Sequence, residues 1–275
     1  MLRGHSWCYR NEFASIPECE DGDVVDVYSS NRRFVGRGFF QAAGGIAVRI
    51  MACHQAVVDG AFLGERIAEA HAFRQRLFPG QNVYRWIFGE SDGLPGLVAD
   101  RYGAVVAVQT SCAFYGRHLD VLATAFASHE GVEGVRLEAG HEIVRAGVVP
   151  EAIEVAVDGI RVLVSLDSGQ KTGLFLDQRA NWPEVRRFAQ GSRVLDGHCY
   201  QGMWSIHAAM AGARDILGVD TSAPAIDAAN AAAQLNNVAD RCRFECADVA
   251  EVLARGERYG VIVLDPPAFA KSRGR

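Results

Sequence analysis

The pattern of apolar and polar positions changes twice along the chain. Up to about residue 54 it shows short runs of partial apolar alternation, DGDVVDVYS and RFVGRGFF, followed by the apolar run GGIAVRIM. Alternation with a period of two is typical of half-buried strands, and glycines or a serine-asparagine turn separate these runs. Short strands at this spacing predict a small β-barrel, which we assign to residues 1–56.

A helical repeat and further strands follow in residues 57–167. In DGAFLGERIAEAHAFRQRLF (59–78) apolar residues recur every three to five positions, which predicts a helix ended by Pro79-Gly80. The stretch YRWIFGESDGLPGLVADRYGAVVAVQT predicts three strands, because glycines and a proline interrupt it twice. We expect a helix around 116–128, then short strands to about 166, and so a mixed α/β domain.

Strand-like and helix-like segments alternate strictly from about residue 190. SRVLDG, DILGVD, CRFECAD and YGVIVLDPP are strand-like, and MWSIHAAMA, SAPAIDAANAAAQLNN and VAEVLAR lie between them. This order predicts an α/β domain at 168–275 with a doubly wound, Rossmann-like parallel sheet. Ser222 is expected to cap its helix, with Pro224 in the first turn. Such sheets normally have about six strands, so we expect this one to be truncated after strand four.

Composition and charge narrow the functional classes. The 275 residues are 49% hydrophobic and 22% charged, which is ordinary for a globular protein. No stretch approaches the roughly 20 apolar residues of a membrane span, and the N-terminus has no apolar signal segment. The seven cysteines are dispersed without a CxxC pair, which predicts no metal site and fits a cytoplasmic protein. A net charge of -5 argues against a protein that coats nucleic acid, although a local basic groove is compatible with it.

The turn in VLDGHCYQGMWS (194–205) fits neither familiar nucleotide fingerprint. Gly197 and Gly202 form GxxxxG, but Met203-Trp204 replaces the lysine and hydroxyl residue of a phosphate-binding loop. A dinucleotide turn needs GxGxxG, and Cys199 stands at its second glycine. S-adenosylmethionine has no pyrophosphate and tolerates fewer glycines, so this cofactor fits better.

Three aspartates follow successive strands of the predicted sheet. Asp196, Asp220 and Asp248 stand at the carboxyl ends, where ligands bind such sheets. Each alone could be a helix cap or a solvated strand end. Together they favour a cofactor site, with Asp196 facing the methionine ammonium, Asp220 the ribose diol and Asp248 the adenine amino group.

The fourth strand ends in a loop suited to a planar base. VIVLDPPAF places Asp265, Pro266 and Pro267 after a buried strand, with Phe269 close behind. Consecutive prolines stiffen a loop and remove N–H donors, so exposed carbonyl groups and an aromatic ring can hold a base at the methyl donor. We therefore expect Asp265, Pro266 and Phe269 to form the target-base loop of a nucleobase methyltransferase.

Two groups of basic residues are candidates for RNA contact. NRRFVGRGFF interleaves Arg32, Arg33 and Arg37 with phenylalanines, which indicates either a strand with a solvated basic face or an RNA-contacting face. Lys171 and Lys271 are the two lysines among 28 basic residues. In a chain that otherwise uses arginine, each lysine could have either a specific role or a random surface location.

Several motifs together resemble the class I family of ribosomal RNA large-subunit methyltransferase I. They are LRGHSWCY, GESDGLPGLVADRYG (89–103), SGQKTGLFLDQRANW (168–182), DGHCYQG and DPPAFAKS (265–272). The resemblance covers essentially the whole chain. It implies a PUA domain, a central α/β domain and a Rossmann-like methyltransferase domain. It also implies S-adenosyl-L-methionine as cofactor and large-subunit rRNA as partner, with a homodimer as the candidate assembly and no membrane.

The resemblance also assigns individual residues. Read by itself, QKTGLFLDQR is a linker whose polar groups could form internal ion pairs. The resemblance implies instead that its members wall the cofactor or face RNA phosphate. The cofactor wall is Phe175, Asp177 and Gln178, and the cofactor turn adds His198, Tyr200 and Gly202. The phosphate-facing residues are Lys171 or Arg179, with Lys271 in the last loop. The sequence departs from the family at His198, where an aromatic is preferred, and at Gln201, which replaces a small hydroxyl residue.

Characterised relatives methylate carbon 5 of cytosine, which requires a cysteine thiolate that adds to C6 and a base that removes the C5 proton. Pro267 stands where related enzymes often carry a cysteine, so the nucleophile is expected beyond residue 275. Cys199, Cys242 and Cys246 are interpreted as packing residues. Three alternatives stay open: methylation of another base or atom, an RNA-binding or assembly factor without catalysis, and an NAD-dependent oxidoreductase.

Overall fold

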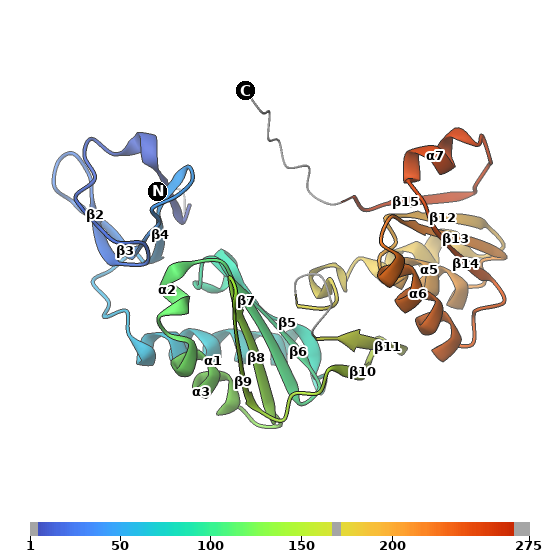
Figure 1. The fold of residues 1–275 in the computed structure, drawn as a ribbon, viewed down its shortest axis with the longest axis horizontal. Coiled ribbons are helices and arrows are strands. Elements are labelled where there is room, and N and C mark those ends of the chain that lie inside the picture. Colours follow the sequence, from blue (N-terminus) through green and yellow to red (C-terminus); the bar gives the residue numbers. More distant parts are fainter. Residues whose placement is uncertain (1–4, 167–171, 267–275) are drawn as a thin grey trace. The chain divides into compact units, whose positions relative to one another are not determined.

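The computed structural model describes residues 5–166 and 172–266 and divides into two compact units (Figure 1). The first unit comprises Met1–Glu151 and Ser165–Asp177, and the second comprises Ala152–Val164 and Gln178–Arg275. Each unit therefore contains two separate stretches of sequence. The limits of the three domains expected from the sequence stay a prediction.

The first unit begins with a four-stranded antiparallel sheet of order β1-β4-β3-β2. Its strands are β1 (Trp7–Tyr9), β2 (Val24–Tyr28), β3 (Phe34–Phe40) and β4 (Ile46–Ala52), and the short helix η1 (Arg10–Glu12) follows β1. Inward-facing apolar side chains form a small core of their own, which includes Cys8, Val27, Phe40 and Ile50. The small β domain predicted from the alternation is thus confirmed.

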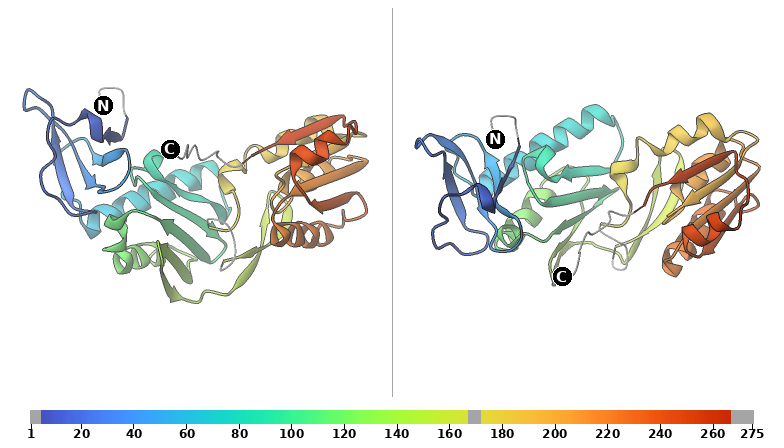
Figure 2. Two further views of the ribbon diagram at one scale, coloured as in Figure 1. Left: turned by 45° about the horizontal axis from the view of Figure 1, so that its top comes forward. Right: turned by 90° about the horizontal axis from the view of Figure 1, so that it is seen from above.

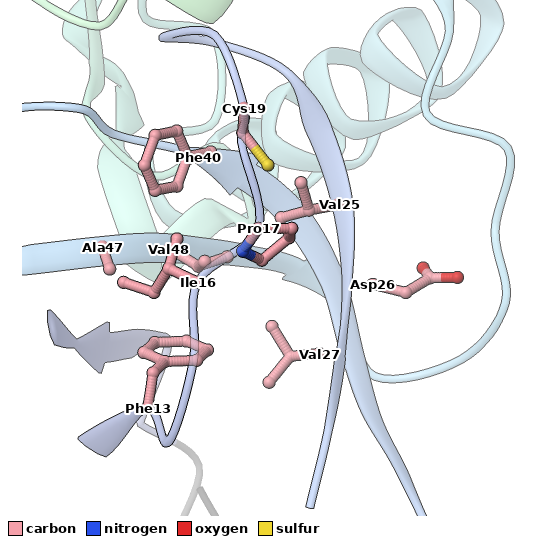
Figure 3. Close-up of a pocket in the computed structure, with 10 residues that line it drawn as sticks. All are labelled: Phe13, Ile16, Pro17, Cys19, Val25, Asp26, Val27, Phe40, Ala47 and Val48. Atoms are coloured by element: carbon pink, nitrogen blue, oxygen red, sulfur yellow. The ribbon is translucent and has the colours of Figure 1, made fainter. Parts of the chain in front are cut away.

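A cavity of about 60 Å³ lies within this small core (Figure 3). Nine of its lining residues are apolar or cysteine, and they are Phe13, Ile16, Pro17, Cys19, Val25, Val27, Phe40, Ala47 and Val48. Asp26 also lies at the cavity, but its carboxylate points away from the apolar side chains, as expected for the outward position between Val25 and Val27 on a strand.

A five-stranded sheet of order β5-β6-β7-β8-β9 forms the rest of the first unit. Its strands are β5 (Val83–Phe88), β6 (Leu97–Tyr102), β7 (Val105–Thr110), β8 (Gly134–Ala139) and β9 (Glu142–Gly147). The other elements are α1 (Gly60–Leu77), η2 (Gly89–Asp92), α2 (Ala113–Gly116) and α3 (Leu119–Ala127). The helix expected around 116–128 is confirmed as α3, and the short helix α2 precedes it, with a turn of the chain at Arg117 and His118 between them.

Helix α1 packs its apolar side into the core of this sheet. Asp59 caps the helix by accepting a hydrogen bond from the N–H of Phe62 at 3.0 Å. Trp86 of β5 is completely buried, and its indole N–H donates to the carbonyl of Ile67 in α1 at 3.0 Å. The helix is thus attached to the sheet by a buried hydrogen bond as well as by apolar contact.

The N-terminal sheet and the central sheet contact each other within the first unit. Phe39 of β3 stacks on Phe114 of α2, with ring centroids 5.0 Å apart. Glu90 in η2 accepts a hydrogen bond from the indole of Trp7 at 2.6 Å and pairs with Arg49 at 2.5 Å. One carboxylate of the central sheet therefore binds two side chains of the N-terminal sheet.

The second unit contains a parallel sheet of order β14-β13-β12-β15, with helices between its strands (Figure 2). Its elements are β12 (Arg193–Gly197), α5 (Met203–Met210), β13 (Asp215–Asp220), α6 (Ala223–Leu235), β14 (Cys242–Cys246), α7 (Val249–Ala254) and β15 (Val261–Leu264). The expected series of four parallel strands is confirmed. Ser222 also caps α6 as expected, because its Oγ accepts from the N–H of Ala225 at 3.4 Å.

A β-hairpin from earlier in the sequence belongs mostly to the second unit. It consists of β10 (Ala152–Val157) and β11 (Ile160–Ser165). Asn236, which follows α6, binds both the N–H and the carbonyl of Arg161, at 2.9 and 2.7 Å. The remaining elements of this region are η3 (Leu176–Gln178), η4 (Trp182–Val185) and α4 (Arg186–Ala189).

Candidate functional site

The turn from β12 to α5 has an unusual backbone. His198, Tyr200 and Gly202 all have positive φ, at 63°, 48° and 74°. Glycine adopts this region without cost, whereas two non-glycine residues there are uncommon and strained. Such strain persists only where the surroundings enforce it, and it concentrates at binding and active sites.

Backbone hydrogen bonds hold this turn against the neighbouring strand. The N–H of Cys199 donates to the carbonyl of Val219 at 3.0 Å, and the N–H of Gly202 donates to the carbonyl of Cys199 at 2.8 Å. The N–H of Tyr200 donates to Oδ2 of Asp220 at 3.0 Å. The strained conformation is thus held by one hydrogen bond within the turn and by two hydrogen bonds to β13.

Asp196 is a completely buried carboxylate at the end of β12. Its Oδ2 atom accepts hydrogen bonds from the N–H and the Oγ of Ser205, at 3.0 and 2.7 Å. Its Oδ1 atom is buried and has no hydrogen-bond partner within the described residues. Burial, reinforced by the charges of Asp265 and Asp220, raises the pKa of Asp196 to about 7. A buried carboxylate with one open oxygen fits a cationic ligand group.

Asp220 ends the adjacent parallel strand and connects two loops. Its Oδ2 binds the N–H of Tyr200, as described above, and its Oδ1 accepts from the N–H of Ser222 at 3.0 Å. Because β12 and β13 run parallel in register, Asp196 and Asp220 lie at the same edge of the sheet. Each carboxylate oxygen of Asp220 keeps a second lone pair, which can accept a ligand hydroxyl.

Asp265 and Pro266 stand at the same edge, directly after β15. This strand pairs with β12, and the N–H of Asp265 reaches the carbonyl of Gly197 at 3.4 Å. The structure therefore brings together the carboxyl ends of β12, β13 and β15. Pro267 and Phe269 of the expected base loop lie outside the described residues.

Asp248 has a local structural role. Its side chain caps α7 by accepting from the N–H of Ala250 at 2.7 Å, and the residue is exposed. The cap alone accounts for an aspartate at this position. Contact between Asp248 and an adenine stays a prediction.

Two residues that shape this site, Ser205 and Phe244, were not identified from the sequence. Ser205 supplies both bonds to Asp196, and the fold of the turn between them decides that this residue of α5 faces the carboxylate. The ring of Phe244 fits against two glycines, because a Cβ on Gly202 would lie 2.8 Å from it and a Cβ on Gly218 would lie 2.4 Å from it. The glycine in DILGVD thus marks a close approach of a side chain to the backbone.

The cysteines of the second unit that lie deepest are poor nucleophiles. Cys199 is buried, and burial together with Asp196 and Asp220 raises the pKa of its thiol strongly. Burial also raises the pKa of Cys242, to about 12. A thiol with a raised pKa stays protonated near neutral pH, so both cysteines agree with the packing interpretation.

The segment 172–177 is attached to the central sheet of the first unit. The hydroxyl of Thr172 donates to the buried Asp100, and the N–H of Leu174 donates to the phenol oxygen of Tyr102 at 2.8 Å. Asp177 lies 3.1 Å from a guanidinium nitrogen of Arg85. These contacts join the segment to the central sheet and not to other residues of the linker, so ion pairs internal to the linker stay a prediction.

The residues expected to wall the cofactor fall in both units. Phe175 is partly buried and belongs with Asp177 to the first unit, whereas Gln178 begins the second. Their contact with a cofactor stays a prediction.

The placement of Arg179 differs from the expectation that it faces RNA phosphate. Its side chain is only 3% exposed and pairs with Asp158 at 2.5 and 3.0 Å. Asp158 occupies the β10–β11 turn with a φ of 51°. Because a buried guanidinium needs a compensating charge, this arginine serves the attachment of the hairpin.

The other residues expected at RNA are divided. Arg32 and Arg33 are exposed in the β2–β3 turn, as a basic surface requires. Arg37 instead donates two bonds to Asp26, at 2.7 and 2.9 Å. Lys171 and Lys271 lie outside the described residues.

Neither a metal site nor a membrane span is found in the described part of the chain. Across residues 5–166 and 172–266, no group of three or more His, Cys, Asp or Glu side chains is arranged to hold a metal ion. Over the same ranges, no helix has the length and apolar character that crossing a membrane requires.

The geometry defines the class of the second unit. A parallel sheet of order β14-β13-β12-β15 carries a buried acid, Asp196, at the end of β12. It carries a hydrogen-bonded acid, Asp220, at the end of β13. Its turn has too few glycines for a pyrophosphate and no phosphate-binding lysine. These features define a Rossmann-like S-adenosylmethionine-dependent methyltransferase.

Comparison with known proteins agrees with this class. Residues 1–52 match the model of a PUA-like domain, and residues 113–274 match that of an S-adenosylmethionine-dependent methyltransferase. Ribosomal RNA large subunit methyltransferase I of Pseudoalteromonas atlantica is 33% identical over 99% of this chain and 74% of its own length. The protein of that name from Escherichia coli is 31% identical over 100% of this chain and 75% of its length. The chain therefore belongs to the ribosomal RNA large subunit methyltransferase I family, with S-adenosylmethionine as its cofactor.

Solved structures show the same fold. A protein of Streptococcus mutans assigned as an S-adenosylmethionine-dependent methyltransferase aligns with a TM-score of 0.87, at 22% identity, over 99% of this chain and 76% of that one. A methyltransferase from Agrobacterium tumefaciens aligns with a TM-score of 0.52, at 20% identity, over 68% of this chain and 59% of that one.

Proposed function

We propose that this methyltransferase acts on large-subunit ribosomal RNA and transfers the methyl group to carbon 5 of a cytosine. The substrate follows from the names of the curated relatives, which are ribosomal RNA large subunit methyltransferases. The observation that carries the proposal is the set of strand ends at one edge of the second sheet, where Asp196, Asp220 and Asp265 come together.

The acidic residues at this edge fit the cofactor. The open Oδ1 of Asp196 would accept the methionine ammonium, and the remaining lone pairs of Asp220 would accept the ribose hydroxyls. The positive-φ turn from His198 to Gly202 would present its backbone to the ligand at this edge, and the absence of a side chain at Gly202 makes room for the Phe244 ring behind the turn. When bound, S-adenosylmethionine supplies an electrophilic methyl group.

The residues after β15 are proposed to receive the target base. Asp265 and Pro266 begin this loop beside β12, so a base held there would lie near the cofactor edge of the sheet. Pro266 has no N–H, so this part of the loop offers carbonyl acceptors to the exocyclic amino group of a cytosine.

The position on the base depends on a thiolate that the second unit's buried cysteines do not supply. Carbon 5 of cytosine becomes nucleophilic only after a thiolate adds to C6. The raised pKa of Cys199 and of Cys242 argues against either one in this role. The base and the atom must therefore be tested directly.

The test uses unmodified large-subunit rRNA and S-adenosylmethionine labelled in its methyl group. Nucleosides from the digested product are separated by mass spectrometry, and 5-methylcytidine is the expected labelled species. Label on guanine or on an exocyclic nitrogen would contradict methylation of carbon 5. The proposal that the protein methylates RNA would still stand. RNA binding without any transfer would support the assembly factor instead.

Calorimetry with S-adenosylhomocysteine tests the cofactor site separately. Wild type is expected to bind, and Asp220→Ala is expected to bind much more weakly, because it removes the ribose acceptor and the anchor of Tyr200. Unchanged binding by the variant would contradict the assigned role of Asp220. We further propose the cytoplasm as the compartment, since rRNA is the substrate and the cysteines are free.

A further inference from the structure

The turn between β2 and β3 presents two unpaired cations. Arg32 and Arg33 are exposed, and within the described residues neither guanidinium has a carboxylate partner or a hydrogen bond. Elsewhere in the same hairpin, the positive charge of Arg37 is neutralised by Asp26. The tip of the hairpin therefore carries a local excess of about two positive charges in a protein whose net charge is -5.

The backbone of this turn is held in one conformation. The N–H of Ser29 donates to the carbonyl of Arg33, and the N–H of Arg32 donates to the carbonyl of Ser29, both at 2.9 Å. The Oγ of Ser29 also accepts from the N–H of Arg33 at 3.1 Å and donates to Asn31 at 2.5 Å. Arg32 is held at a φ of 59°. The two arginines thus project from a pre-organised turn, which lowers the entropic cost of binding.

An exposed aromatic residue ends the strand that leads into this turn. Tyr28, the last residue of β2, is 53% exposed. Its ring contacts Phe34 edge to face, with centroids 5.7 Å apart and an interplanar angle of 77°. Because the residue is half exposed and an edge-to-face contact occupies at most one face of its ring, the ring has exposed surface on which a base can stack.

We propose that the tip of the β2–β3 hairpin binds an unpaired nucleotide of the RNA substrate, with the base stacked on Tyr28 and the adjoining phosphates on Arg32 and Arg33. This inference rests on the proposed RNA substrate and adds to it a single-stranded target. A nucleotide combines a flat π-face with a phosphate, and the tip combines an exposed aromatic ring with two exposed, unpaired cations. An acidic peptide would use the arginines and leave the ring without a partner.

The experiment measures RNA affinity of the whole chain by fluorescence anisotropy at low salt. The probes are a labelled single-stranded oligoribonucleotide and a fully paired duplex of the same length. The variants are Tyr28→Ala, Tyr28→Phe and the double variant Arg32→Ala with Arg33→Ala. Arg258→Ala, which removes an exposed arginine of the second unit, is the matched control.

Tyr28→Ala is expected to weaken single-strand binding by about tenfold, within the range known for one stacked base, and to leave duplex binding nearly unchanged. Tyr28→Phe keeps the ring and should restore the affinity. The double arginine variant should weaken both probes and lower the salt dependence by about 0.7 per lost phosphate contact on the single strand. Arg258→Ala should bind like wild type.

Unchanged single-strand affinity in Tyr28→Ala, or an equal loss on the duplex, would overturn the stacking role. If wild type methylates rRNA and all tip variants do so equally well, this inference fails and the proposed function stands. If wild type binds RNA through the tip and transfers no methyl group, the proposed function fails and the tip contact stands. A chain that binds neither probe overturns this inference, and the methyl-transfer assay on rRNA decides the proposed function separately.

Discussion

Asp196 accepts two hydrogen bonds from Ser205, and both end on the same carboxylate oxygen. The backbone N–H and the hydroxyl of Ser205 lie 3.0 and 2.7 Å from Oδ2 of Asp196. This arrangement fixes the orientation of the carboxylate and leaves its other oxygen, also buried, for a ligand. The serine therefore prepares the site without itself needing to contact the cofactor.

Removing the Ser205 hydroxyl is expected to weaken cofactor binding moderately. Ser205→Ala loses one bond to a charged group, which is typically worth about 1.5–3 kcal/mol, but keeps the backbone N–H bond. We expect S-adenosylhomocysteine to bind about tenfold more weakly by calorimetry. Ser192→Ala, which removes an exposed hydroxyl bonded to the Phe188 carbonyl, should leave binding unchanged. Equal affinity of Ser205→Ala and wild type would show that the hydroxyl does not position the carboxylate.

Cofactor binding should depend on pH through Asp196. Its pKa of about 7 in the ligand-free protein means that the carboxyl is largely protonated below pH 7. A cationic ligand group favours the carboxylate, so binding at low pH must release a proton. The dissociation constant should therefore fall as pH rises from about 5.5 to 7, by up to about tenfold per unit, and level off above.

Asp196→Asn provides the control for this pH profile. The amide has nearly the same shape and does not titrate in this range, so its weaker binding should be independent of pH. A flat profile for wild type, or the same slope in Asp196→Asn, would assign the titration to another group.

Gly202→Ala should destabilise the second unit for two reasons that a matched variant can separate. Its φ of 74° strains any other residue, at a cost of about 1–3 kcal/mol, and its new Cβ would lie 2.8 Å from the Phe244 ring. Gly191 has a similar φ of 68°, and a Cβ added there would have no atom within 4 Å, so Gly191→Ala reports the backbone strain alone. Urea unfolding should show the larger loss in Gly202→Ala, and equal losses would exclude the contact with Phe244.

The ion pair of Arg85 and Asp100 is expected to be important for stability. Both side chains are buried, and their atoms approach to 2.6 Å. Asp100→Asn leaves the guanidinium short of one charge in a dry environment, which should cost about 3–5 kcal/mol in urea unfolding. The exposed pair of Arg187 and Glu184 is the control, and Arg187→Ala should unfold like wild type. A small effect at Asp100 would mean that Asp177 suffices as the partner of Arg85.

Cys199 is expected to be dispensable for methyl transfer. Its thiol is buried in the cofactor turn and has a raised pKa, so it stays protonated at neutral pH. Cys199→Ala should retain transfer to rRNA within a few-fold of wild type, because it removes a weak thiol contact with the Tyr200 carbonyl at 3.8 Å and some packing near Gly218. A complete loss of transfer, in a variant that still binds S-adenosylhomocysteine and unfolds normally, would make this thiol the nucleophile.

The sequence pattern predicted the elements of the second sheet well, because each strand and helix there has its own apolar period and its own turn. It also placed Asp196 and Asp220 correctly, since the ends of parallel strands meet at one edge whatever side chains lie between. Ser205 and Phe244 were missed because their role depends on which neighbour they face across the turn. That choice is made by tertiary packing and leaves no local signal.

The charged residues were the hardest to interpret. Arg179, Arg37 and Arg33 look alike in sequence, yet one is buried against Asp158, one is paired with Asp26 and one is exposed. Asp158 is 21 positions from Arg179, and Asp26 is 11 positions from Arg37. The residues immediately around each arginine therefore do not show whether it is paired. Whether an arginine is available to RNA is decided by the fold around it.

The β10–β11 hairpin has a consequence for the order in which the chain can fold during synthesis. The first unit needs Ser165–Asp177, and the second needs Ala152–Val164, which is made earlier. The hairpin is therefore synthesised well before Asn236, whose side chain joins it to the second unit. The first unit cannot be completed until Ser165–Asp177 has been synthesised, which is after most of the hairpin. Neither unit is a continuous stretch of sequence, so a fragment that begins at Gln178 would lack Asp158, whose carboxylate pairs with the buried Arg179.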